Sequence, residues 1–139
     1  MTVCLVLFSC STQKSSDEKP PLYEILKQDE QGGANFRFFE IVTEKKEFKM
    51  LLNDKDLKRK INPSDINTCN FLLLNMGEKN SGGYSFSIEN IEETENDIII
   101  TIKENGPKGV ATTVMTYPFS IVNYKLNIYV QLRHSNRGN

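Results

Sequence analysis

The side chains that most often carry out catalysis are scarce in this chain of 139 residues. It has one histidine, His134, in a polar stretch near the C-terminal end, and three cysteines, of which Cys69 alone lies in the part expected to fold. A catalytic nucleophile needs a base beside it, and a structural zinc site needs about four nitrogen or sulfur ligands. We therefore predict no catalytic residues, no metal and no cofactor. Cys69 precedes the apolar run Phe71–Leu74, which favours a buried structural thiol over a reactive one.

Two further patterns could in principle do chemistry, and both have simpler explanations. Glu92, Glu93 and Glu95 lie among polar residues, which is typical of a solvated turn and not of an acid–base pair. The glycine-containing stretch Gly77–Gly83 leads from one predicted strand to the next, whereas a phosphate loop leads into the N-terminus of a helix. The formal net charge of −1 offers no basic face, so we expect no nucleic-acid partner.

The opening residues indicate a different chemistry, the acylation of a thiol. Val3–Phe8 is apolar and too short to span a bilayer as a helix, but it suits the core of a signal peptide. Leu7-Phe8-Ser9-Cys10 resembles a bacterial lipobox, in which a small residue precedes the cysteine that receives the acyl chains. This assigns residues 1–9 to a signal peptide and Cys10 to lipidation.

Two alternatives remain open for this segment. Met1-Thr2 carries no positive charge, so either the true start lies upstream or the segment is not a functional signal. In the second case Val3–Phe8 would be a buried first strand. The polar residues that follow favour the lipoprotein interpretation.

Residues 10–21 read as the lipidated cysteine followed by a flexible tether. Ser11–Pro21 has no apolar side chain and ends in two prolines, so it cannot contribute to a core. A tether of this length reaches on the order of 20 Å. We therefore expect a membrane-anchored lipoprotein of the bacterial cell envelope, facing the periplasm or the surface.

Residues 22–133 are predicted to form a single β-rich domain, with 134–139 as a polar tail. Alternating or continuous apolar runs predict strands over Leu22–Lys27, Phe36–Val42, Phe71–Met76, Tyr84–Glu89, Ile98–Lys103, Val110–Tyr117, Phe119–Tyr124 and Leu126–Leu132. The regular spacing favours an antiparallel sheet or a sandwich. Phe71–Met76 is almost continuously apolar, so we expect a central strand covered on both faces.

One helix is predicted beside these strands. Thr43 can cap it and Glu44 falls in its first turn, while Phe48, Leu51 and Leu52 form one apolar stripe. The helix is expected from about Glu44 to Leu57. The predicted fold class is therefore α+β, a mainly antiparallel sheet or sandwich with one helix packed on it.

The stretch Leu72–Ile91 is the most distinctive in the chain. An apolar strand is followed by Gly77-Glu78-Lys79, then by Gly82-Gly83-Tyr84 and an alternating strand. This pattern resembles the PrcB C-terminal domain family, named for an accessory subunit of a bacterial surface protease complex. Further parts of the chain resemble the family too: Asp97–Glu104, Thr113–Pro118 and, more loosely, Val42–Leu52. The resemblance implies a secreted or lipid-anchored β-rich domain that acts as a protease partner or accessory.

The residues of this motif also have a physical interpretation. Gly82 and Gly83 can adopt positive φ, which tightens a turn or lets another backbone approach closely. Tyr84 and Tyr117 are amphipathic and suit a contact patch. The alternative is that the glycines only shape the turn and the tyrosines only fill the core. The candidate partner-contact residues are Gly77, Glu78, Lys79, Gly82, Gly83, Tyr84, Tyr117 and Pro118.

The predicted function is a non-enzymatic, lipid-anchored module that binds an exported protein, with a protease as the leading candidate. Two alternatives stay open: a protease inhibitor that presents the Gly-Gly-Tyr loop, and a structural envelope lipoprotein. An enzymatic activity would require a site completed by another chain.

Overall fold

The computed structural model describes residues 21–125 and 129–135. Within these residues the chain forms seven strands, one α-helix and one short 3-10 helix, in the order β1 (Tyr23–Asp29), β2 (Arg37–Val42), α1 (Lys45–Leu52), η1 (Asp65–Asn67), β3 (Asn70–Met76), β4 (Ser85–Glu93), β5 (Asp97–Asn105), β6 (Phe119–Tyr124) and β7 (Tyr129–His134). The predicted signal peptide, Cys10 and nearly all of the predicted tether lie outside the described residues.

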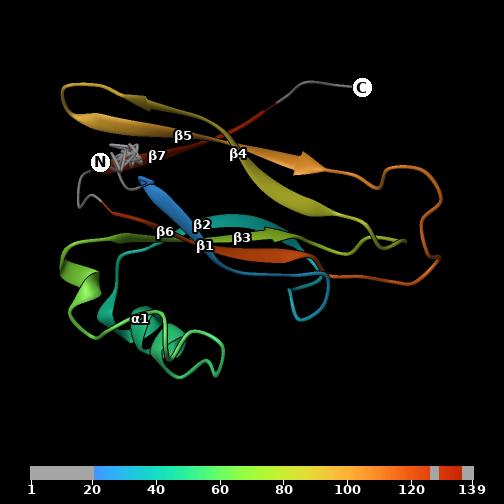
Figure 1. Ribbon diagram of the computed structural model, residues 1–139, viewed down its shortest axis with the longest axis horizontal. Coiled ribbons are helices and arrows are strands. Elements are labelled where there is room, and N and C mark those ends of the chain that lie inside the picture. The colour runs from blue at the N-terminus through green and yellow to red at the C-terminus, as the bar shows by residue number, and fades with distance from the viewer. Residues whose placement is uncertain (1–20, 126–128, 136–139) are drawn as a thin grey trace, which may run out of the picture.

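The strands form two sheets that stack face to face. The four-stranded sheet has the order β1-β6-β3-β2 with every neighbouring pair antiparallel, and the three-stranded sheet has the order β4-β5-β7. Figure 1 shows the three-stranded sheet over one face of the four-stranded sheet and α1 below the other face. The predicted α+β fold, a mainly antiparallel sandwich with one helix packed on it, is confirmed.

One pairing has a direction that the sequence did not indicate. β7 runs parallel to β5, from Asp97 opposite Tyr129 to Ile102 opposite His134. β7 therefore extends to a residue that the sequence placed in the polar tail. Leu126, where this strand was predicted to begin, lies outside the described residues.

The main core lies between the two sheets. Ile98, Ile100 and Ile102 of β5 are at most 1% exposed and pack against the buried residues Leu72, Leu74 and Met76 of β3. These positions are spaced by two, so the alternation predicted for β5 is confirmed. A polar link also joins the sheets, because the Tyr124 hydroxyl donates to Glu93 Oε1 at 3.3 Å. Burial and that carboxylate raise the pKa of Tyr124.

A second core lies between α1 and the opposite face of the four-stranded sheet. Phe48 and Leu51 of α1 are buried there, and the Phe48 ring lies 4.8 Å from that of Phe71 on β3. β3 is thus covered on both faces, as its continuous apolar run predicted. Cys69 is a free thiol, half-buried against this core, with Sγ 3.7 Å from Thr68 Oγ1.

The helix is shorter than predicted. Glu44, and not Thr43, occupies the N-cap, and the helix ends at Leu52 instead of Leu57. The helix stops early because of a hydrogen bond just beyond its last residue. There Asp54 Oδ1 accepts from the backbone amide of Asp56 at 2.8 Å. Such a side-chain-to-backbone bond competes with helical hydrogen bonding.

The predicted strand Val110–Tyr117 is wrong. This segment belongs to the long connection between β5 and β6, and one isolated bridge, from Lys79 to Thr116, ties it to a neighbour. Val110, Val114 and Met115 are 105%, 54% and 47% exposed. β-branched residues favour a strand where a pleated surface receives their side chains, and here the chain has left the sheet.

Candidate functional site

Three loops meet at one end of the sandwich. The β1–β2 loop (30–36), the β3–β4 loop (77–84) and the β5–β6 loop (106–118) follow or precede strands that terminate on the same side. In Figure 1 they lie together at the right of the molecule. We call these three loops the loop end.

Backbone hydrogen bonds hold the loop end together. The Glu78 amide donates to Asn35 O at 3.1 Å and the Gly82 amide donates to Thr112 O at 3.1 Å. Lys79 and Thr116 exchange two backbone bonds of 2.9 Å each. The β3–β4 loop is thus fixed between the other two loops.

The glycines of the motif allow this close packing. Gly82 is buried, and a Cβ there would lie 2.7 Å from Thr112 Oγ1. Gly83 has φ +88°, and a Cβ there would lie 2.8 Å from Pro107 Cβ. Gly77 is buried too, with φ +76°. Both parts of the predicted explanation, positive φ and close approach, therefore operate in this turn.

The predicted contact residues divide into a buried and an accessible group. Gly77 and Gly82 are buried, and Pro118 is buried with its carbonyl accepting from the Met76 amide at 2.9 Å. These residues have little surface to offer a partner. The accessible residues are Glu78, Lys79, Gly83, Tyr84 and Tyr117.

The two tyrosines flank Glu78 and Lys79. The Tyr117 hydroxyl donates to Glu78 Oε2 at 3.1 Å, and this bond raises the pKa of Tyr117. Lys79 Nζ lies 5.3 Å from the centre of the Tyr84 ring, within the range of a cation–π contact. The structure therefore places Tyr117 beside Glu78 and Tyr84 beside Lys79, and a shared contact patch of the two tyrosines stays a prediction.

Glu30 joins the loops of the loop end, and no sequence pattern marks it as a functional residue. Its carboxylate accepts from the Gly83 amide at 2.5 Å, and its carbonyl accepts from the Tyr117 amide at 2.8 Å. Next to it, Gln28 Oε1 accepts from the Phe86 amide at 3.0 Å. The residues joined are more than fifty positions apart, and an acidic residue in a turn has no distinguishing pattern.

Asn75 is a second residue whose side chain holds the loop end in place. It is 2% exposed; its Oδ1 accepts from the Ala34 amide at 2.9 Å, and its Nδ2 donates to Ala34 O at 3.0 Å and Phe36 O at 2.5 Å. Gly33 makes room for it, since a Cβ at Gly33 would overlap Asn75 Oδ1 and Tyr117 O. A polar residue within the apolar run of β3 was a visible signal that the sequence interpretation missed.

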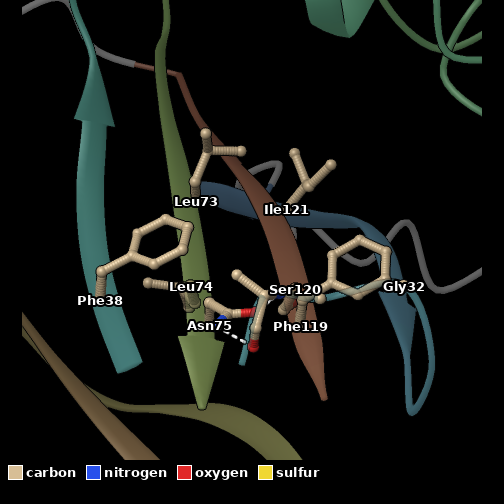
Figure 2. Close-up of a pocket in the computed structure, with 10 residues that line it drawn as sticks. Gly32, Phe38, Leu73, Leu74, Asn75, Phe119, Ser120 and Ile121 are labelled. Atoms are coloured by element: carbon tan, nitrogen blue, oxygen red, sulfur yellow. Dashed lines mark hydrogen bonds between the residues drawn. The ribbon is translucent and has the colours of Figure 1, made fainter. Parts of the chain in front are cut away.

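Several hollows surround these residues. Tyr84 lines two of them, one with Glu104 and Pro107 and the other with residues 28–31 and Ser85. A third, of about 140 Å³, lies on the α1 side of the four-stranded sheet, because Leu73, Phe119 and Ile121 in its lining also pack in the core beneath α1. Figure 2 shows its lining, which is mostly apolar and includes Phe38, Leu73, Asn75, Phe119 and Ile121.

Comparison with known protein families finds a match for the second half of the chain. Residues 71–132 match the model of the PrcB C-terminal family. The predicted resemblance is confirmed, and the family suggests a subunit associated with a protease complex. No curated protein and no solved structure matches the chain.

The PrcB C-terminal segment begins in β3 and ends in β7, so it contains two of the three loops of the loop end. Its β5–β6 loop carries the exposed side chains of Val110, Val114 and Met115. The β1–β2 loop, from outside the segment, adds Phe36, which is 64% exposed. Exposed apolar side chains on loops at the same end of a domain make that end a candidate protein–protein contact site.

Across residues 21–125 and 129–135, no three side chains of His, Cys, Asp or Glu come close enough together to hold a metal ion. The helices in this part of the chain are also too short or too polar to cross a membrane.

Proposed function

We propose that this protein is a non-enzymatic, lipid-anchored protein of the bacterial cell envelope that acts as an accessory subunit of an exported protease. It binds this partner through the loop end. The match of residues 71–132 to the PrcB C-terminal family supports the association with a protease. The family's role as an accessory supports a binding function over a catalytic one.

The observation that carries the proposal is the β5–β6 loop. It is braced at Thr112 and Thr116 by the β3–β4 loop, yet Val110, Val114 and Met115 between and before these points are exposed. A braced loop loses little conformational entropy when it binds, and its apolar side chains gain by leaving water. The accessible residues Lys79 and Tyr84 add a polar rim to this surface.

The anchor rests on the sequence around Cys10. The lipobox-like Leu7-Phe8-Ser9-Cys10 and the polar Ser11–Pro21 run support a lipid-anchored module held off the membrane surface. Two or three acyl chains, at about 0.8 kcal/mol for each buried methylene, hold a protein on a bilayer durably. Mass spectrometry of the native N-terminus tests this part, and an unmodified Met1 would overturn it.

Site-specific photocrosslinking tests the contact with a protease. A photoreactive amino acid at Val114 is expected to crosslink an exported protease in intact cells. The same group at Met50, which is 71% exposed on α1 at the other face of the sheet, is the matched control and is expected to crosslink little. Crosslinks from Met50 but not from Val114 would contradict the assignment of the loop end.

Substitution provides the second half of this test. Val114→Asp is expected to weaken capture of the crosslinked protease at least tenfold, while Met50→Asp leaves it unchanged. Both side chains are exposed, so the stability of each variant is expected to stay within about 0.5 kcal/mol of the parent. Equal capture by both variants would overturn the proposal.

Protease inhibition remains the alternative. The Gly-Gly-Tyr loop does not protrude, because Gly82 is buried against Thr112 and Gly83 is bonded to Glu30. The more exposed β5–β6 loop would be the better inhibitory element. Titration of cysteine and serine proteases with the protein separates the two functions, since an accessory subunit leaves their activity intact.

A further inference from the structure

The outer side of β2 is an open sheet edge. β2 ends the order β1-β6-β3-β2 and pairs with β3 alone, over six residues without a shift in register. Figure 2 shows it beside β3, on the side away from β6. We call this outer side of Arg37–Val42 the β2 edge.

The hydrogen-bonding pattern identifies the groups on the β2 edge. The Met76 amide of β3 donates to Pro118 O, toward β6. Backbone groups alternate sides along a strand, so Asn75 and Leu73 direct theirs toward β2, where they meet Phe38 and Glu40.

The intervening residues of β2 are therefore the ones that face outward. The backbone N–H and C=O groups of Arg37, Phe39 and Ile41 point away from the sheet. Among the residues that the structure describes, no group hydrogen-bonds to them. Three donors and three acceptors are thus spaced as a β-strand requires.

Two other edges are protected. β1 has an irregular register between Ile25 and Lys27, and Lys60 Nζ donates to Leu26 O at 2.5 Å. β4 has an irregular register after Ile88, its Phe86 amide is bonded to Gln28, and its second half is acidic. Bulges, charges and side-chain caps are the devices that prevent strand pairing at an edge. β2 has neither a bulge nor a cap.

The side chains of β2 define what would lie beside them. Phe36, Phe38, Phe39 and Glu40 line a hollow of about 340 Å³. Arg37 is already engaged, with Nε 2.7 Å from Glu104 Oε1. Glu40 is exposed and makes no ion pair within the described part of the chain.

We propose that the β2 edge receives an extended segment of the exported partner as a fifth strand of the four-stranded sheet. The open N–H and C=O groups require a β-strand as the occupant. The aromatic hollow favours an apolar side chain beside Phe38, and the unpaired carboxylate favours a lysine or arginine beside Glu40.

The β2 edge is continuous with the proposed contact surface, because Phe36 belongs to the loop end and immediately precedes β2. The inference rests on the proposed function, since it describes the part of the same partner that extends past the loops. It also requires something that the proposed function does not, namely that the partner binds through main-chain hydrogen bonds.

Hydrogen exchange of the full chain, measured by NMR, tests the edge itself. The amides of Arg37, Phe39 and Ile41 are expected to exchange at least tenfold faster than those of Phe38 and Glu40. Equal protection at all five would show that the edge is already covered and would overturn the proposal. Protection that rises with protein concentration would identify a second copy as the occupant and would also overturn it.

A synthetic probe then tests strand addition. The probe is an extended peptide of alternating valine and threonine with one central lysine, and its control carries the same side chains with N-methyl groups at alternate residues. The unmethylated peptide is expected to slow exchange at Arg37, Phe39 and Ile41 at least tenfold, whereas the methylated peptide does not. No protection at millimolar peptide would overturn the proposal.

Two pairs of variants locate the bound strand. Arg37→Pro removes one outward donor and is expected to weaken the peptide about fivefold relative to Arg37→Ala, which loses the same ion pair but keeps the amide. Glu40→Lys is expected to weaken the lysine peptide and strengthen a glutamate version, relative to Glu40→Gln. Equal binding within both pairs would contradict strand addition at this edge.

The failure of this inference can be told apart from the failure of the proposed function. Val114→Asp is expected to leave the peptide bound, because Val114 is not part of the β2 edge. If the protease is captured normally by Arg37→Pro and Glu40→Lys but not by Val114→Asp, the loop end is the whole contact and the β2 edge is not used.

Discussion

Replacement of Asn75 by alanine tests whether a single buried amide holds the loop end. The side chain is 2% exposed and forms three hydrogen bonds, one from the Ala34 amide and two to the carbonyls of Ala34 and Phe36. Each such bond contributes about 0.5–1.5 kcal/mol net, so their sum is about 1.5–4.5 kcal/mol. Ala34 and Phe36 are partly exposed, so water replaces some of the lost bonds. We expect Asn75→Ala to lower the free energy of unfolding by about 2 kcal/mol.

Equilibrium unfolding in urea measures this loss. With a slope of about 2 kcal/mol per molar, the midpoint is expected to fall by about 1 M. Asn90→Ala is the matched control, because Asn90 is exposed and its side chain donates to Glu92 alone. We expect it to stay within about 0.5 kcal/mol of the parent. The reasoning is refuted if the two variants unfold at the same urea concentration.

A local measurement separates this tether from general damage to the core. In Asn75→Ala the Ala34 amide loses its acceptor, so its hydrogen exchange is expected to accelerate more than that of the Ile100 amide in the distant three-stranded sheet. Asn75→Asp keeps an acceptor but no longer donates to the two carbonyls when ionised. Its destabilisation is expected to exceed that of alanine at neutral pH and to shrink as acid restores a donor.

Three further substitutions, one of them with a matched control, test other parts of the structure by urea unfolding. Gly33→Ala is expected to cost several kcal/mol, because its Cβ would overlap Asn75 and Tyr117, whereas Gly106→Ala, whose Cβ would meet only Tyr84 at 3.8 Å, stays within about 0.5 kcal/mol. Ile100→Ala in the main core is expected to cost about 2–5 kcal/mol. Lys27 Nζ lies 2.9 Å from Asp54 Oδ2, and this contact lowers the pKa of the Asp54 carboxyl. The stability that the ion pair supplies is therefore present at neutral pH and is lost as pH falls below about 4. Asp54→Asn is expected to remove this dependence, worth less than about 1 kcal/mol, and an unchanged acid slope would contradict the assignment.

The strands could be predicted where burial alone sets the pattern. β5 alternates because one face meets the other sheet, and β3 is continuously apolar because it is covered twice. The same reasoning failed for Val110–Tyr117, whose composition suits a strand but which has no sheet face to cover. The direction of β7 relative to β5 could not be predicted either, since their parallel pairing depends on the path of the chain and not on the residues within the strand.

The candidate site could be predicted in part, and the division has a physical basis. Positive φ at Gly83 is a local property, so its sequence neighbours revealed the turn. The carboxylate of Glu30 reaches the Gly83 amide across a separation of 53 residues, and no local pattern records such a contact. Asn75 is an intermediate case, because a polar residue inside a buried strand indicates a specific hydrogen-bonding partner without naming it.

Gly82 and the proposed contact surface are therefore separate features of the loop end. Gly82 is buried, and its missing side chain leaves room for Thr112 Oγ1 while its amide donates to Thr112 O, two residues before the exposed Val114. A variant at Gly82 would thus disturb partner binding without having touched the partner. The segment 71–132 supplies this arrangement, but Glu30 and β2 lie outside it. The first half of the domain consequently both stabilises the family motif and, through the β2 edge, adds main-chain hydrogen-bonding groups that the motif does not contain.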